Sequence, residues 1–301
     1  MIGHLRSGSA GSGRRGICVA DRLIRYIQSR IKELGRNGAV IGVSGGIDSA
    51  VVLHLCLQAL GRERILALIL PEYDSDPASI RLARRICHGI PFQVIPIGPI
   101  LKKMGIYRYF QILPFQNRLP YRMKSGYVRN VFKKVSKDLY LKFLTNNLPS
   151  EIKMVTAYLR AKNRIRMAIL YQKAEELDYA VVGTINRTEY LLGLFVPFGD
   201  GAADLMPLLP FYKSEIFQIA EELGIDPEIR SRRPTPDLIP GLSDEEIIGL
   251  SYEEIDNGLA VIEGREKQKI NDEKLNYIRS IYERAEPIRR SFPPVAEEIL
   301  E

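Results

Sequence analysis

The 301-residue sequence contains only three cysteines, Cys18, Cys56 and Cys87. Their spacing matches neither a disulfide framework nor a structural metal site. Cys56 lies within an apolar stretch and Cys87 follows an apolar and basic one, so both are expected to be core thiols. So few thiols, with no paired spacing, indicate a reduced, cytoplasmic environment.

Long hydrophobic runs are also missing. No apolar run reaches the roughly 18 to 20 residues that a membrane-spanning helix requires. Residues 1–16 are rich in Gly, Ser and Arg and lack the apolar core of a secretory signal, so we expect a disordered tail there. Residues 17–301 show no internal repeat, and their apolar content is sufficient for one large domain.

Acidic residues are nearly absent from one segment, residues 102–142. Its eleven Lys or Arg and single acid give it a net charge of +10, against −3 for the rest of the chain. Eight aromatic residues are interleaved with these cations. The segment could bind nucleic acid through phosphates and bases, or cover an anionic small molecule as a lid or partner surface. It could also be a solvated helical insertion, at about 100–150, whose aromatic residues pack on the body.

Residues 44–49 read SGGIDS and have the features of a phosphate-binding loop. An apolar run at 39–43 predicts a buried strand before them, and residues 50–60 predict a buried helix after them. A glycine-rich turn between strand and helix brings unpaired N–H groups and the positive end of a helix dipole to one point. The loop has no lysine, which excludes the G-x-x-x-x-G-K-[ST] loop of ordinary P-loop NTPases.

Each residue type in this loop has a physical role. Gly45 and Gly46 allow the backbone to approach an anion closely, and Ser44 and Ser49 add hydroxyl donors. Asp48 supplies a carboxylate that could hold Mg²⁺ against phosphate oxygens.

Strands and helices alternate along the chain, which predicts an α/β fold: a doubly wound, mostly parallel sheet with helices on both faces. Ligands of such sheets bind beyond the carboxyl ends of the strands, where the turns at 44–49 and 184–189 fall. The expected elements are helix 21–34, strand 39–43, helix 49–60, strand 65–70, helix 79–88, strand 92–96, helix 151–177, strand 179–183, a loop carrying Glu189 and Asp200, and helix 213–223. Helices after residue 241 are expected to form a terminal subregion of the same domain.

The SGGIDS string resembles the signature of the N-type ATP pyrophosphatases, which have an adenine nucleotide alpha hydrolase-like fold. Further motifs, in the same order and spacing, resemble those of NAD synthetases. They lie at 164–171, 182–189, 198–205, 212–213, 234–238, 243–245 and 250–256. The resemblance covers roughly residues 20–98 and 155–295 and lapses in the basic insertion.

The resemblance implies an ATP-dependent amide ligase. A deamido-NAD carboxylate would attack the α-phosphate of ATP, pyrophosphate would leave, and ammonia would convert the acyl-adenylate to NAD and AMP. We expect ammonia dependence, because no nitrilase-like glutaminase segment precedes the ligase motifs. The family also implies Mg²⁺ as cofactor and a homodimer whose dinucleotide site draws on both subunits.

The resemblance assigns roles residue by residue. Asp48 and Lys213 are the expected catalytic residues, and Asp48 and Glu189 the expected Mg²⁺ ligands. The expected ATP-binding residues are Gly42, Val43, Ser44, Gly45, Gly46, Ile47, Asp48, Ser49, Thr184, Lys213 and Thr235. The expected deamido-NAD contacts are Arg164, Asp200, Asp204 and Arg289.

Some positions depart from the family pattern. Pro197 stands where many members carry Lys, and Ile288 stands at the His of a C-terminal His-Lys-Arg string, with Arg289 in place of the Lys. Ile185 and Ile239 replace other family residues. These changes fall mainly at positions that the resemblance assigns to the dinucleotide and not to ATP. The prediction of ATP chemistry is therefore firmer than the prediction that deamido-NAD is the second substrate. Two alternatives stay open: a paralogous ATP pyrophosphatase that adenylates another carboxylate or an RNA base, and a nucleotide-binding protein without turnover.

Overall fold

The computed structural model describes residues 18–110, 121–123, 125–126, 139–145, 150–232, 242–265 and 270–290. Its strands are β1 (Gly38–Gly42), β2 (Ile65–Ile69), β3 (Phe92–Val94) and β4 (Tyr179–Val182). Its helices are α1 (Val19–Glu33), α2 (Ile47–Leu60), α3 (Pro77–Ile86), α4 (Gly98–Lys103), α6 (Leu139–Leu144), α7 (Ser150–Leu177), α8 (Arg187–Leu192), α9 (Lys213–Glu222), α10 (Pro227–Arg230), α11 (Asp244–Ile248), α12 (Tyr252–Ile262) and α13 (Asp272–Arg289), with 3₁₀ turns η1 (Arg62–Arg64) and η2 (Ile106–Phe110).

The four strands form one parallel sheet in the order β3-β2-β1-β4. The chain therefore moves outward from β1 to β3 and then returns to the other side of β1. This reversal confirms the predicted doubly wound α/β fold. It also places a topological switch point between β1 and β4, where ligands of such sheets bind.

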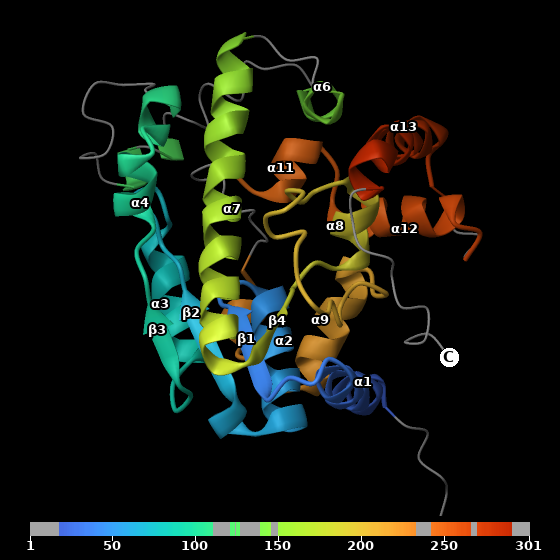
Figure 1. Cartoon of the computed structure of the whole chain (residues 1–301). Coiled ribbons are helices and arrows are strands. Elements are labelled where there is room, and N and C mark those ends of the chain that lie inside the picture. Colours follow the sequence, from blue (N-terminus) through green and yellow to red (C-terminus); the bar gives the residue numbers. More distant parts are fainter. Residues whose placement is uncertain are drawn as a thin grey trace, which may run out of the picture.

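Helices cover both faces of the sheet (Figure 1). On one face, Ile41 and Val182 belong to a core formed with α1, α2, α3 and α9. On the other, the intervening residues Val40 and Val181 pack with α4 and the long helix α7. Strands that are buried on both faces read as continuous apolar runs, which is why their positions were predictable.

The C-terminal helices share an apolar core with two helices from earlier in the chain. Helices α12 and α13 pack with α6 and α8 around a third apolar core that contains Leu192, Ile255 and Ile281. The hydroxyl of Tyr140 on α6 donates a hydrogen bond of 3.0 Å to the carbonyl oxygen of Leu192 on α8. In the part of the chain that the structure describes, no helix is long and apolar enough to cross a bilayer.

Several predicted boundaries differ by one or two residues from the structure, and two differences concern candidate site residues. Helix α2 begins at Ile47, two residues before the predicted start, so Asp48 lies in its first turn. Glu189 lies in α8 and not in a loop. The reason is a capping box, in which the Asn186 side chain accepts from the N–H of Glu189 while the Glu189 side chain accepts from the N–H of Asn186.

Candidate active site

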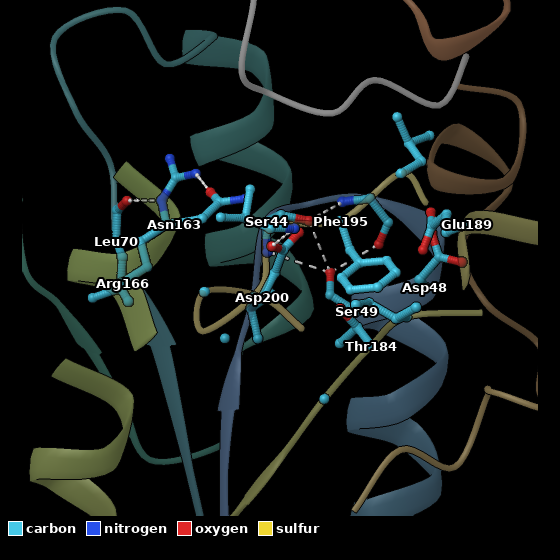
Figure 2. Close-up of a pocket in the computed structure, with 18 of the residues that line it drawn as sticks. Ser44, Asp48, Ser49, Leu70, Asn163, Arg166, Thr184, Glu189, Phe195 and Asp200 are labelled. Carbon is cyan, nitrogen blue, oxygen red and sulfur yellow. Dashed lines mark hydrogen bonds between the residues drawn. The ribbon is translucent and has the colours of Figure 1, made fainter. Parts of the chain in front are cut away.

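A cavity of about 380 Å³ opens at the switch point between β1 and β4. Its lining includes the loop after β1, the turn after β4, residues of 193–202, one side of α7, and residues of α6 and α11. Figure 2 labels Ser44, Thr184, Asp200 and Arg166 among these lining residues. The turn after β4 contributes Gly183, Thr184 and Ile185. The position matches the site predicted from the sequence, and every predicted residue from Gly42 to Ser49 except Gly45 lines this cavity.

The loop after β1 is held in shape by its own serines. The Ser44 and Ser49 hydroxyl oxygens lie 3.2 Å apart, and Ser49 Oγ donates to the carbonyl oxygen of Gly46 at 3.0 Å (Figure 2). The backbone N–H of Gly46 donates to Ser44 Oγ at 3.2 Å. No side chain caps the N-terminus of α2, so the N–H groups of its first turn are left for a ligand.

Gly45 faces α3 and does not line the cavity. Its φ of +85° is a conformation that residues with a side chain rarely adopt. A Cβ atom at this position would lie 2.3 Å from the carbonyl oxygen of Ser79 on α3. A glycine is therefore required for the loop to pack against α3.

Lys213 brings the two predicted metal-binding acids together. Its Nζ lies 2.5 Å from Asp48 Oδ2 and 3.6 Å from Glu189 Oε1, and its side chain is 1% exposed. Burial alone lowers the pKa of Lys213, but the charges of Asp48 and Glu189 outweigh burial and raise that pKa above its ordinary value. Lys213 is therefore a buried ammonium beside loop 44–49.

Neighbouring elements fix the backbone of Lys213 at the start of α9. Thr188 Oγ1 accepts the backbone N–H of Lys213 at 2.9 Å and donates to Asp256 Oδ1 at 2.5 Å. The other oxygen of Asp256 accepts the N–H of Ser214 at 2.8 Å. These contacts tie α8, α9 and α12 together around the lysine.

Asn186 links the two acids. Its Nδ2 donates to Asp48 Oδ1 at 2.9 Å, and its Oδ1 caps the helix that carries Glu189. Burial raises the pKa of Glu189 to about 8, and the nearby charge of Asp48 acts in the same direction. Figure 2 shows the carboxylates of Asp48 and Glu189 side by side at one end of the cavity.

Asp244, at the start of α11, is a third acid of this region. It is 3% exposed and lines the cavity. Its Oδ2 accepts the hydroxyl of Tyr252 at 2.7 Å, whereas its Oδ1 is buried without a hydrogen-bond partner among the described residues. The sequence motif at 243–245 included this residue but gave it no role. No three His, Cys, Asp or Glu side chains in the described ranges are arranged to ligate one metal directly.

The two arginines of α7 leave the helix on different faces, as their spacing predicts. Arg166 lines the cavity, where its Nε donates to the Leu70 carbonyl oxygen and its NH1 to Asn163 Oδ1, both at 3.2 Å (Figure 2). Arg164 is exposed, lies outside the cavity lining and donates to the Pro197 carbonyl oxygen at 3.3 Å. Sequence reasoning selected Arg164, while the structure brings Arg166 to the cavity.

Among the other predicted substrate contacts, only Asp200 lines the cavity; its Oδ1 accepts the N–H of Val196 at 2.8 Å. Asp204 lies outside the lining, because its Oδ2 accepts the N–H of Val181 in β4 at 2.7 Å. Arg289 also lies outside, since its NH1 donates to the carbonyl oxygen of Leu191 at 2.6 Å. Thr235 and Ile239 fall outside the described residues.

Among the aromatic residues of the basic segment that lie in the described ranges, Tyr107 and Tyr140 contact the body. The hydroxyl of Tyr107 donates to Glu72 Oε2 at 3.2 Å, and its ring lies 5.3 Å from that of Tyr73. Tyr140 is buried and lines the cavity together with Phe143. For these two tyrosines the structure favours packing on the body; most of residues 102–142 lies outside the described ranges.

Comparison with known proteins agrees with the family resemblance that the sequence motifs indicate. A family model described as NAD synthase matches residues 19–111 and 129–291. The NH(3)-dependent NAD(+) synthetase of Thermotoga maritima is 44% identical over 278 residues, which cover 91% of this chain and 98% of that protein. The NH(3)-dependent NAD(+) synthetase of Archaeoglobus fulgidus is 33% identical, with 92% and 96% covered.

Solved structures share the fold at lower identity. An NMN synthetase from Francisella tularensis superposes with a TM-score of 0.69 at 24% identity, covering 93% of this chain and 97% of that one. An NH3-dependent NAD synthetase from Campylobacter jejuni, in complex with the nitrate ion, gives 0.62 at 24% identity, with 93% and 98% covered.

Proposed function

The chain belongs to the NAD synthase family, and on that premise we propose that it makes NAD from deamido-NAD, ammonia and ATP, releasing AMP and pyrophosphate. The observation that carries this proposal is the phosphate-binding loop 44–49 with Lys213 at its end, at the switch point of the sheet. A loop of this kind fits a reaction in which two phosphates leave together.

The ATP side of the reaction is supported by the loop geometry. The N–H groups of the first turn of α2 and the hydroxyls of Ser44 and Ser49 hold the β- and γ-phosphates. Lys213 supplies a buried positive charge where negative charge builds up on the α-phosphate. Thr184 lies in the wall of the same cavity and contacts the nucleotide.

Asp48 and Glu189 are suited to hold Mg²⁺. Both carboxylates already face one cation, the Lys213 ammonium, and Mg²⁺ in ATP-using enzymes is commonly bound by one or two carboxylates together with phosphate oxygens. When bound, Mg²⁺ neutralises the charge that develops on the leaving pyrophosphate.

The chemistry needs positioning more than acid or base groups. A carboxylate oxygen of deamido-NAD attacks the α-phosphorus, and the bond to the pyrophosphate oxygen breaks. Ammonia then attacks the carbonyl carbon of the acyl-adenylate and loses a proton. AMP leaves with the former carboxylate oxygen, and the amide remains on the dinucleotide.

The acceptor lies at the other end of the cavity, where Arg166, Asn163 and Asp200 provide polar groups beside the apolar wall of Phe195. We propose that the dinucleotide extends beyond this cavity toward the exposed Arg164, and that a second subunit of a homodimer completes its site. We also propose a cytoplasmic location, because Cys18, Cys56 and Cys87 are all free thiols.

The test is an assay of NAD formation by the full chain with deamido-NAD, ATP, Mg²⁺ and ammonium. We expect NAD, AMP and pyrophosphate in equal amounts, and no NAD when glutamine replaces ammonium. Nicotinate mononucleotide and tRNA serve as competing acceptors in parallel reactions. Amidation of the mononucleotide alone, or AMP release that requires RNA, would replace this proposal with another acceptor.

A further inference from the structure

Three acids, Asp48, Glu189 and Asp244, lie with Lys213 in the wall of one cavity. Only Asp48 lies within 3 Å of Nζ in this group of acids. Asp244 keeps one buried oxygen without a partner, and a buried acceptor in that condition is costly unless some state of the protein uses it.

Lys213 also occupies the place that a metal ion would need. Its Nζ lies 2.5 Å from Asp48 Oδ2 and 3.6 Å from Glu189 Oε1, and the other oxygen of each acid accepts a hydrogen bond from Asn186. A Mg²⁺ ion requires carboxylate oxygens at about 2.0–2.1 Å. The ammonium and the dication therefore cannot share this position, and Lys213 must move when the metal binds.

We propose that Asp244 is a positioning residue for Lys213: when a divalent cation binds Asp48 and Glu189, the displaced ammonium moves to the free Oδ1 of Asp244, which lines the same cavity, and there it faces the α-phosphate. This inference rests on the metal site of the proposed function and adds a residue to it. Asp244 acts through Lys213 and does not ligate the metal.

Tyr252 lies between the two positions of the ammonium. Its ring centroid is 5.4 Å from Lys213 Nζ, and its hydroxyl holds Asp244 Oδ2 at 2.7 Å. The ring face offers a surface over which an ammonium can pass, since cations are attracted to aromatic faces. Because the hydroxyl occupies Oδ2, the partner left for Lys213 is Oδ1.

The experiment measures Mn²⁺ binding to the nucleotide-free full chain by electron paramagnetic resonance, with Mg²⁺ checked by calorimetry. Lys213→Met removes the competing cation and should tighten Mn²⁺ binding roughly tenfold. Asp244→Asn removes the alternative partner and should weaken binding roughly tenfold in the wild-type background. In the Lys213→Met background, Asp244→Asn should change binding less than about twofold, because no ammonium needs a new position.

Equal weakening by Asp244→Asn in both backgrounds would overturn the proposal, because a direct charge effect does not require Lys213. No weakening in the wild-type background, or no measurable binding by Lys213→Met, would overturn it as well. Glu253→Gln removes an exposed acid of α12 and is the matched control, for which we expect unchanged affinity.

A second variant covers the case in which Asp244→Asn does not fold. Tyr252→Phe removes the hydroxyl from Asp244 Oδ2, so the carboxylate attracts Lys213 more strongly and Mn²⁺ binding should tighten about threefold. Unchanged or weaker binding in Tyr252→Phe would contradict the proposal. No substrate is present in these measurements, so failure of the proposed amidation would leave their outcome intact.

Discussion

Asp48→Asn tests the charged centre of the site. The substitution keeps the shape of the side chain and its contact with Asn186, but it removes the charge closest to the buried Lys213 ammonium. Breaking a buried ion pair typically costs 3–5 kcal/mol. Glu189 remains 3.6 Å from Nζ, so we expect the lower end, about 3 kcal/mol. Small domains are stable by about 5–15 kcal/mol, so the variant should still fold.

Activity should fall much further than stability. Asp48→Asn removes a proposed metal ligand and leaves the ammonium without its closest partner, so kcat/KM for NAD formation should drop at least about 100-fold. Urea unfolding and steady-state kinetics measure the two effects separately. Glu175→Gln is the control, because it removes one exposed partner of Arg36 and should cost less than about 1 kcal/mol without loss of activity. Turnover close to wild type in Asp48→Asn would refute the role assigned to this carboxylate.

Three further predictions follow from the geometry. Gly45→Ala should lower the free energy of unfolding by more than about 2 kcal/mol in urea and abolish ATP binding, because its Cβ would meet the Ser79 carbonyl oxygen. Gly224→Ala, at φ +66° in open space, should cost only about 1 kcal/mol; equal losses for both would contradict the packing argument. Ellman's reagent should modify one thiol per native chain, Cys18, and three after unfolding, because burial raises the pKa of both Cys56 and Cys87 to about 12; rapid reaction of a second thiol in the native protein would show that burial does not protect them. Light scattering at micromolar concentration should give twice the mass of one chain, and a fully active monomer would exclude the dimer.

The fold and the arrangement of residues around loop 44–49 were predictable because their signals are local. Apolar runs bounded by turns define the buried strands, and loop 44–49 lies between the first strand and its helix. The family motifs identified Asp48, Glu189 and Lys213, and the structure brings these three residues together at the switch point. Residues at the carboxyl ends of neighbouring parallel strands meet in space however far apart they are in the chain.

The rest of the site depends on contacts between elements that the sequence does not display. Spacing showed that Arg164 and Arg166 leave α7 on different faces, but the face toward the cavity is set by packing of α7 on the sheet. The Asp204 carboxylate accepts a hydrogen bond from the backbone N–H of Val181 in β4. The sequence motif around Asp204 did not reveal this contact. The environment of Asp244 depends on Tyr252, eight residues away on another helix, and no periodic pattern marks such a pair.

The most direct test of the account follows one oxygen atom. Deamido-NAD labelled with ¹⁸O at both oxygens of its nicotinate carboxylate is converted with ATP, Mg²⁺ and ammonium, and the products are separated and analysed by mass spectrometry. We expect one ¹⁸O atom in each AMP molecule and none in pyrophosphate, because the carboxylate oxygen attacks the α-phosphorus and leaves with AMP. Formation of ADP with ¹⁸O in orthophosphate, or unlabelled AMP, would contradict adenylation of the carboxylate at this site.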